Sequence, residues 1–316
     1  MFMPLRLLST ALLLALGLPE PVLADAVTVP GLHRIDIMSK AVGRPYRLLV
    51  HVPSAPPPPG GYPLVVVLDG NLYFATTVDA LRLQGRHFLR PAVVLGVGYQ
   101  TDDIIAQLTL REKDLTLPID AKQLEKPIYR LVTGPRVPPV SAYGDLDAVL
   151  RMIEAEAIPA VRALVPLDLA DRHIVGHSLG GLGALRALFN GPACWRTATA
   201  SSPSIWWADR AVLKDRPMQD GRCKGPHSLL LIVGGHEEEK PPGVPALPPG
   251  LDPAELSMAG NVKALSAELA AGSRIAVREV VQADDDHVSI VPLSISRALR
   301  FALGRHPEDW LRAPDR

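Results

Sequence analysis

The chain has 316 residues, of which 47% are hydrophobic and 21% charged, and its 33 Lys and Arg residues balance its 33 Asp and Glu residues. This composition is typical of a globular protein, and the length suits one large α/β domain with insertions. The zero net charge argues against a nucleic-acid-binding protein, because such proteins depend on a surplus of basic residues.

The N-terminus has the layout of a secretory signal peptide over residues 1–24. One positive charge precedes the apolar run 7–18. Val22 and Ala24 supply small residues at the −3 and −1 positions of a cut after Ala24, and a cut after Ala26 is the alternative. An uncleaved anchor is the competing interpretation, but the run is shorter than the roughly 20 residues that cross a bilayer. We therefore expect a periplasmic or secreted protein with no stable membrane insertion after cleavage.

Eight segments rich in aliphatic and β-branched residues are predicted strands. They are Leu32–Ile37, Arg47–Val52, Leu64–Leu68, Ala92–Val97, Ile174–Val175, Thr197–Ala200, Leu229–Val233 and Ile275–Val281. The middle segments are continuously apolar, as in strands that are buried on both faces of a parallel sheet. The first two alternate more and are joined by a short turn, which predicts an antiparallel edge.

Apolar residues spaced by three and four predict helices between these strands. Two of these helices are expected over residues 72–83 and 182–189, and three more are expected to begin at Asp145, Asp252 and Ala298. Asp145 and Asp252 are candidate capping residues, and Gly191 is expected to end a helix in the left-handed conformation. Alternating strands and helices predict a single doubly wound α/β domain over residues 25–316.

Two long segments do not fit this alternation. Residues 99–143 are largely polar and predict a lid-like insertion, and residues 237–251 are rich in proline. The second half of the insertion is basic, and this half, or Arg111, could bind an anionic acyl or catecholate group. A solvated loop without a ligand is the alternative for these charges.

The two cysteines, Cys194 and Cys223, are predicted to mature in an oxidising compartment and to form a disulfide, with two unrelated buried thiols as the alternative. They cannot form a zinc site alone. His173 and His177 are spaced by four, but on a strand and its turn this spacing corresponds to about 13 Å. We therefore predict no metal and no cofactor.

The segment Gly176-His177-Ser178-Leu179-Gly180 lies between a predicted buried strand and a predicted helix. A sharp strand-to-helix turn exposes a serine, and glycines two residues to either side avoid a collision of side chains there. Ser178 is therefore the candidate nucleophile. The alternative is a glycine-rich turn with a capping serine.

The base and the acid should follow the nucleophile in loops after later strands. His287 follows the last predicted strand and is the candidate general base. Glu237 is the first carboxylate after the preceding strand and is the tentative acid. The sequence leaves open Glu238, Glu239, Asp284 and a Ser–His dyad without an acid. His177 is expected to pack rather than to catalyse.

A tetrahedral oxyanion needs two backbone donors. The Leu179 amide, at the start of the helix after Ser178, is one candidate. The second is the amide of Gly70 or Asn71, in the loop after the third predicted strand, for which a plain turn before a helix is the alternative.

Six motifs in this order resemble the putative-esterase (esterase D-like) group of α/β hydrolases. They are VLDGNLYF, REKDLT, GHSLGGLGAL, SSPSIWW, VGGHEE and DDHVSIVP. The group includes periplasmic trilactone esterases that act on catecholate siderophores, and the resemblance covers Val27 to Gly304. It implies an α/β-hydrolase fold, Ser178 as nucleophile and His287 as base. The siderophore-type members are thought to manage with a weak or missing acid.

The resemblance also implies that residues 202–207 form a wall beside the nucleophile. Trp206 and Trp207 in this segment offer flat aromatic surface to an aryl ligand, although both rings could equally fill the core. One departure from the group is Leu117, which separates the Asp-Leu-Thr motif from Pro118 and could reshape the pocket there.

The sequence thus favours a serine-dependent carboxylic ester hydrolase that works through an acyl-enzyme. Its expected substrate is a small-molecule ester, with an anionic or catecholate siderophore ester as the favoured class. The alternatives are an acyltransferase on the same scaffold and a ligand-binding protein that has the fold without catalysis.

Overall fold

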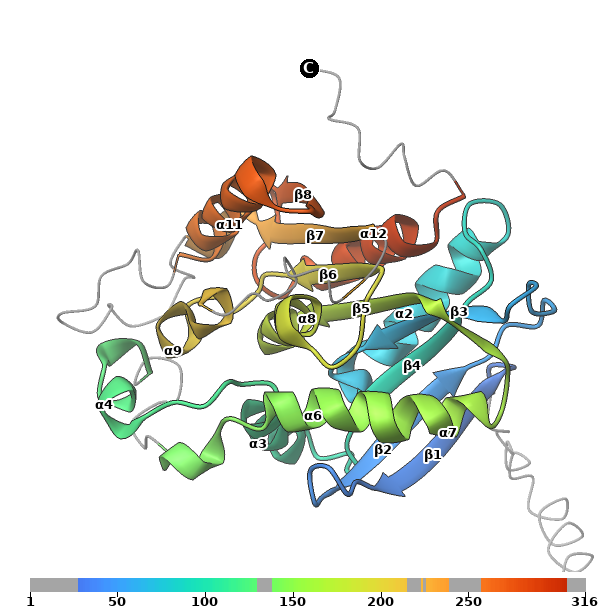
Figure 1. The fold of residues 1–316 in the computed structure, drawn as a ribbon, viewed down its shortest axis with the longest axis horizontal. Helices are drawn as coiled ribbons and strands as arrows, with labels where there is room; N and C mark the ends of the chain where they lie inside the picture. The colour runs from blue at the N-terminus through green and yellow to red at the C-terminus, as the bar shows by residue number, and fades with distance from the viewer. Residues whose placement is uncertain (1–27, 130–137, 215–222, 224–225, 239–256, 306–316) are drawn as a thin grey trace, which may run out of the picture. The chain divides into compact units, whose positions relative to one another are not determined.

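An eight-stranded sheet organises the computed structural model (Figure 1). The structure describes residues 28–129, 138–214, 223, 226–238 and 257–305. The predicted signal peptide lies outside these residues, as do the expected helix start at Asp252, the candidate acid Glu239, and residues 130–137 in the second half of the insertion. Residues 31–316 form one compact unit.

The strands are β1 (Leu32–Met38), β2 (Pro45–His51), β3 (Tyr62–Val67), β4 (Val93–Gly98), β5 (Leu167–His177), β6 (Thr197–Ser201), β7 (His227–Gly234) and β8 (Ile275–Gln282). Their spatial order is β1-β2-β4-β3-β5-β6-β7-β8. β1 and β2 form the predicted antiparallel edge, and the pairs from β4 to β8 are parallel. Every residue of β3 and β4 is buried, as their continuous apolar sequences predict.

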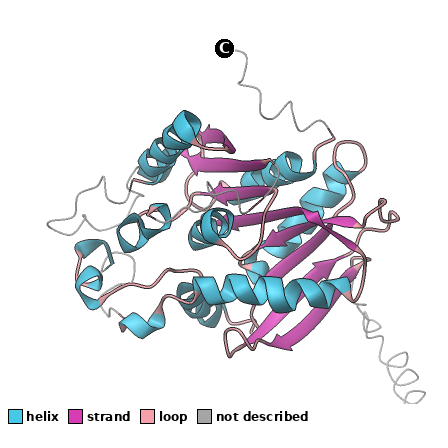
Figure 2. Ribbon diagram, viewed as in Figure 1, coloured by secondary structure: helices cyan, strands magenta, loops and turns pink. Residues whose placement is uncertain are grey.

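The helices cover both faces of this sheet (Figure 2). They are α2 (Gly70–Gly85), α3 (Ile104–Asp114), α4 (Ala121–Leu124), α6 (Leu146–Met152), α7 (Ile158–Arg162), α8 (Leu179–Asn190), α9 (Trp207–Arg210), α11 (Met258–Gly272) and α12 (Val291–Leu303). Short helical segments are η1 (Val140–Ala142), η2 (Ile153–Ala157), η3 (Ala211–Leu213) and η5 (Gly235–Glu238). Within the described residues, no helix is both long and apolar enough to span a bilayer.

Alternate residues of β7 show how the two faces are covered. Leu229, Leu231 and Val233 belong to the main core, together with apolar residues of α6, α8 and α11. Leu230 and Ile232 pack instead with Phe301 of α12. Because side chains alternate along a strand, α12 and the helix α2 that packs against it lie on the opposite face of the sheet from α8.

The insertion over 99–143 is fixed to the body of the protein wherever it is described. Leu115, Leu117 and Leu124 are buried in the main core. The backbone oxygen of Leu117 also accepts a hydrogen bond of 2.7 Å from the indole of Trp207. This part of the predicted lid therefore packs against the core of the domain. Its helix α3 contributes residues to the candidate active site described below.

Two local predictions about helix ends are wrong. Asp145 precedes α6 but makes no capping hydrogen bond, because its carboxylate binds Arg44 at 2.8 Å and lies 3.5 Å from Lys113. Gly191 ends α8 in an extended conformation (φ −67°, ψ 163°) rather than a left-handed one. Capping of the described start of α11 comes from Ser257, whose hydroxyl accepts the Gly260 amide at 2.9 Å.

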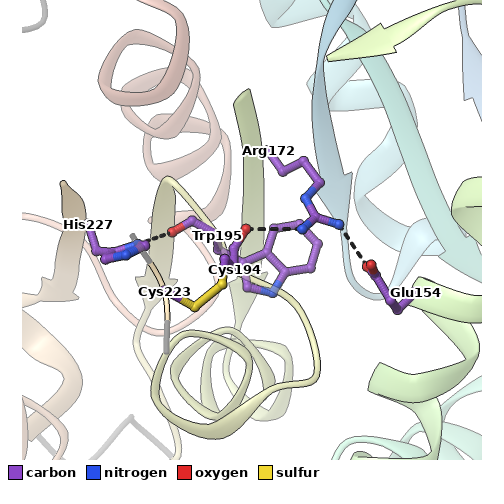
Figure 3. The surroundings of a disulfide bond; sticks show 6 residues. All are labelled: Glu154, Arg172, Cys194, Trp195, Cys223 and His227. Atoms are coloured by element: carbon purple, nitrogen blue, oxygen red, sulfur yellow. Dashed lines mark hydrogen bonds and ion pairs between the residues drawn. A yellow bond between two sulfur atoms is a disulfide. The ribbon is translucent and has the colours of Figure 1, made fainter. Parts of the chain in front are cut away.

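The disulfide prediction is confirmed, because Cys194 and Cys223 are bonded across 29 positions of sequence (Figure 3). The bond joins the segment after α8 to the segment before β7. Arg172 reinforces the same region, since its guanidinium donates to the Cys194 carbonyl at 3.3 Å and to Glu154 at 2.8 Å. The cross-link thus holds the strand ends opposite the site, at the amino-terminal edge of β6 and β7.

Candidate active site

The backbone at Ser178 is held in a sharp turn between β5 and α8. Its dihedral angles (φ 59°, ψ −118°) lie in a region that non-glycine residues occupy only under strain, which costs about 1–3 kcal/mol. A Cβ atom on Gly176 would lie 2.0 Å from the carbonyl oxygen of Gly180. The glycine is therefore required for the turn to close, as the sequence predicts. The Ser178 amide donates to the Ser201 carbonyl at 2.9 Å, which ties the turn to β6.

Glu237 and His287 are brought together at the same edge of the sheet. Glu237 is in η5 directly after β7, and His287 is in the loop after β8; Nδ1 of His287 lies 2.8 Å from Oε2 of Glu237. A Cβ atom on Gly234 would lie 2.4 Å from the Asp285 carbonyl oxygen, so this glycine allows the two loops to cross. This role of Gly234 was not predicted from the sequence.

The environment of Glu237 suits a fixed anion. Its side chain is 1% exposed, and its second oxygen, Oε1, accepts the Gly234 amide at 2.8 Å and the Ser202 hydroxyl. Because an ionised carboxylate only accepts hydrogen bonds, Nδ1 of His287 is the donor in their contact, and Nε2 is the nitrogen left to accept a proton. The His287 side chain is 42% exposed, so it remains accessible from the cleft.

The two aspartates directly before His287 in the sequence have other hydrogen-bond partners. Asp286 caps its own turn, where its carboxylate accepts the amides of Val288 and Ser289 at 2.7 and 2.8 Å. Asp285 accepts the Ser289 hydroxyl at 2.7 Å. Within the described residues, Glu237 is the carboxylate that contacts the His287 ring.

His177 lies beneath the base rather than in the reaction path. Its ring centre is 4.6 Å from that of His287. Its Nδ1 lies 3.1 Å from the Ser201 hydroxyl, and that hydroxyl donates a hydrogen bond of 2.9 Å to the Ser294 hydroxyl. Burial, with smaller contributions from the neighbouring His287 and Arg111, lowers the pKa of His177 to about 3. The ring is therefore neutral near pH 7, and its predicted packing role agrees with this placement.

Ser178 and His287 line one cleft of about 360 Å³. The remaining lining side chains come from α2, from α3, from the last residue of β5, and from the loop before α12 and its first turn. They are Leu72, Tyr73, Thr76, Leu108, Arg111, His177, Val288, Val291 and Pro292. The cleft thus combines two chemically active groups with a mostly apolar wall, which suits an organic substrate.

Arg111 lines this cleft, but its charge is already compensated. Its guanidinium makes two hydrogen bonds to Asp69, of 2.8 and 2.9 Å, and the two side chains are 12% and 2% exposed. Arg111 therefore does not present an uncompensated charge to the cleft, and its binding of an anionic group stays a prediction. Asp69 escaped sequence reasoning, although it directly precedes the predicted turn at Gly70. It has a left-handed backbone (φ 55°).

The two tryptophans do not line the Ser178 cleft. Trp207 is 2% exposed, and its indole nitrogen binds the carbonyl of Leu117, so this ring fills the core. Trp206 is 8% exposed and lines a separate pocket beside α4 and α9. Of the two interpretations that the sequence leaves open, core packing describes Trp207, and Trp206 also belongs to the main core while it borders the second pocket.

The candidate oxyanion donors stand at two helix starts. Leu179 and Gly70 are the first residues of α8 and α2, and Asn71 is the second of α2. The first amides of a helix lack partners within it. In α2 the next two amides, those of Leu72 and Tyr73, already donate to the Asp69 carbonyl at 2.9 and 3.1 Å. The side-chain oxygen of Asn71 accepts a hydrogen bond from the Tyr99 amide at 2.6 Å. Its side-chain nitrogen donates to the Tyr99 carbonyl at 3.1 Å.

The described residues contain no group of three or more His, Cys, Asp or Glu side chains that could hold a metal ion. His173 and His177, the pair spaced by four, bind different partners: His173 contacts Thr197 at 2.8 Å and Asp171 at 3.1 Å. The absence of a metal and of a cofactor remains a prediction.

Comparisons with known proteins agree with this geometry. Residues 118–239 match the family model described as "Putative esterase". The ferri-bacillibactin esterase BesA of Bacillus subtilis is 32% identical over 90% of this chain and 93% of its own. The chain belongs to this esterase family.

Two further matches support the same conclusion for this esterase. The siderophore triacetylfusarinine C esterase of Aspergillus fumigatus is 31% identical over 79% of this chain and 83% of its own. The crystal structure of the BES protein from Bacillus cereus superimposes with a TM-score of 0.75, at 26% identity, over 89% of this chain and 99% of that one. The fold is that of the α/β hydrolases, and the esterase is a carboxylic ester hydrolase.

Proposed function

We propose that this esterase hydrolyses the ester bonds of a siderophore through a covalent acyl-enzyme on Ser178, with His287 as general base and Glu237 as the acid that orients it. The observation that carries the proposal is the shared cleft of Ser178 and His287, in which His287 is held by the buried carboxylate of Glu237. The names of two relatives, which act on ferri-bacillibactin and on triacetylfusarinine C, support the substrate class.

In the acylation step, the Ser178 oxygen attacks the ester carbonyl carbon while Nε2 of His287 takes the hydroxyl proton. Glu237 keeps the proton on Nδ1 and stabilises the imidazolium that forms. The amide of Leu179 and that of Gly70 or Asn71 donate to the oxyanion. When the tetrahedral intermediate collapses, the bond to the leaving alkoxide breaks, and His287 gives that oxygen its proton.

In the deacylation step, His287 takes a proton from water, and the resulting hydroxide attacks the acyl carbon. Collapse of the second intermediate releases the carboxylic acid and returns the proton to the Ser178 oxygen. An alcohol in place of water would give acyl transfer. The half-exposed His287 favours water as the acceptor, because bulk solvent reaches the base directly.

We further propose that residues 1–24 direct the esterase to the periplasm or out of the cell and are removed there. The disulfide between Cys194 and Cys223 supports an oxidising destination. The mass of the mature protein from the periplasmic or extracellular fraction tests this, with cleavage after Ala24 or Ala26 expected. A chain that retains its first residues would contradict it.

A hydrolysis panel tests the activity. The wild-type esterase should open a catecholate trilactone and label with a fluorophosphonate at Ser178, whereas Ser178→Ala should lose about 10⁴-fold or more in kcat and show no adduct. Trilactone left intact alongside rapid hydrolysis of p-nitrophenyl acetate would contradict the siderophore substrate. Product analysis with added alcohols would reveal an acyltransferase if transfer exceeded hydrolysis.

A further inference from the structure

The segment after β6 connects the turn at the candidate nucleophile to a second pocket. The Ser204 amide donates to the carbonyl oxygen of Ser178 at 3.1 Å, so this segment is attached to the turn that carries the nucleophile. Trp206, two residues later, lines a pocket of about 250 Å³. Because consecutive Cα atoms are about 3.8 Å apart, the Cα atom of Trp206 is within about 8 Å of that of Ser204.

The pocket is formed between the segment that follows α4 and the start and end of α9. Figure 1 shows α4 and α9 beside each other. Its lining residues are Lys126, Ile128, Tyr129, Trp206, Asp209 and Arg210. None of them also lines the Ser178 cleft. The two hollows are therefore separate sites with no lining residue in common.

The lining of this pocket combines aromatic rings with an excess of positive charge. The rings of Tyr129 and Trp206 are inclined by 56°, with their centres 6.0 Å apart. Of the two cations, Lys126 is paired with Asp209. Arg210 is exposed, and its guanidinium makes no hydrogen bond or ion pair with any residue that the structure describes. One positive charge is thus available to a ligand.

The backbone that presents Arg210 is strained. Ala208, Asp209 and Arg210 have φ angles of 48°, 55° and 60°, in the left-handed region that residues with a Cβ atom rarely occupy. Contacts from the insertion hold this turn: the Ala208 amide donates to the Tyr129 hydroxyl at 2.8 Å, and Asp209 binds Gln123 and Lys126. Strain of this kind occurs preferentially at ligand sites, where surrounding contacts maintain it.

The Ser178 cleft lacks such a free charge. Arg111 is the one Lys or Arg side chain among its lining residues, and Asp69 neutralises it. A polyanionic substrate would therefore find its unpaired positive charge in the second pocket and not beside the nucleophile.

We propose that this pocket binds an anionic aromatic ring of the catecholate type, as one arm of the substrate whose ester reacts at Ser178. Arg210 pairs with the ring oxygens, and Trp206 and Tyr129 contact the ring itself. The proposal rests on the proposed siderophore esterase function, to which it adds the second point of attachment that would favour a multi-armed aryl ester over a simple one.

Steady-state kinetics with two substrates test the site. For Arg210→Gln we expect the KM of a catecholate trilactone to rise about tenfold with kcat within twofold, whereas p-nitrophenyl acetate, which has no second arm, keeps both constants. Arg162→Gln, an exposed arginine at the end of α7, is the matched control and should leave both substrates unaffected. An unchanged trilactone KM, or an equal change for both substrates, overturns the proposal.

Direct binding keeps the test independent of the proposed substrate. Titration calorimetry with 2,3-dihydroxybenzoate should show binding to the wild-type esterase that weakens about tenfold in Arg210→Gln. Binding should persist after a fluorophosphonate has blocked Ser178. Absence of binding, or its loss on blocking, overturns the proposed pocket. Failure to open a trilactone while 2,3-dihydroxybenzoate still binds in this way would instead contradict only the siderophore substrate.

Discussion

The side chains of Glu237 and His287 meet through a 2.8 Å hydrogen bond across 50 positions of sequence, with the acid almost fully buried and the base half exposed. Burial gives Glu237 a fixed position, and exposure leaves His287 accessible to substrate and water. This pairing favours a complete triad over the dyad that the resemblance to siderophore-type members leaves open.

Replacing this acid should impair the chemical step. We expect Glu237→Gln to lower kcat by about 10²–10⁴-fold, because the amide cannot stabilise the imidazolium as the carboxylate does. KM should change little. Asp284→Asn is the control and should retain wild-type kinetics. A Glu237→Gln enzyme with wild-type kcat would mean that Ser178 and His287 work without this acid.

The ion pair of Arg111 and Asp69 should be important for stability. Both side chains are almost fully buried, so removing one partner leaves an uncompensated charge, and Arg111→Gln should lower the free energy of unfolding in urea by about 3–5 kcal/mol. Arg82→Gln breaks an exposed pair with Asp79 and should cost less than about 1 kcal/mol. Equal, small losses in the two variants would argue against a structural role for the buried pair.

His177 should make the esterase sensitive to acid. Its pKa is about 3 in the folded state against 6.5 for an ordinary histidine, so below pH 6.5 the unfolded chain binds a proton that the folded protein does not. The stability due to the neutral ring is complete above pH 6.5 and is lost as the pH falls, by about 2 kcal/mol at pH 5. Urea unfolding at pH 7, 6 and 5 measures this loss.

The matched comparison for this effect is His177→Gln against His33→Gln. Between pH 7 and pH 5, the free energy of unfolding of the first variant should fall by about 2 kcal/mol less than that of the wild type. The reason is that this variant has no imidazole at position 177 that takes up a proton on unfolding. The second changes an exposed histidine and should follow the wild-type profile. Parallel profiles for all three proteins would show that the ring of His177 is accessible to protons in the folded state.

The disulfide should stabilise the fold without affecting catalysis. A cross-link over 29 positions lowers the conformational entropy of the unfolded chain, which raises its free energy by about 3–4 kcal/mol. The free energy of unfolding of a double Cys194→Ser, Cys223→Ser variant should therefore be lower by the same amount. Its kcat should stay within twofold of wild type, since neither cysteine lines the cleft. Dithiothreitol should reproduce the loss in the wild type and have no effect on the variant.

Much of the site was predictable because it follows from short-range rules. Glycines around Ser178 mark a turn that only small residues permit, and a parallel sheet places every strand-to-helix loop at one edge. The order of Ser178, Glu237 and His287 after β5, β7 and β8 therefore indicated a common site before any coordinates. Helix ends were less predictable, since the Asp145 carboxylate binds Arg44 and Lys113 instead of its own helix.

The sequence by itself determined the fold class, the edge of the sheet that carries the site, and the residues eligible for each chemical role, because these depend on periodicity, turn chemistry and strand order. Only the tertiary structure decided how charged and aromatic groups are used. Arg111 is neutralised by Asp69, 42 positions away, and Trp206 and Trp207 diverge into a second pocket and the core. Such pairings depend on which distant surfaces pack together, and no local pattern encodes that choice.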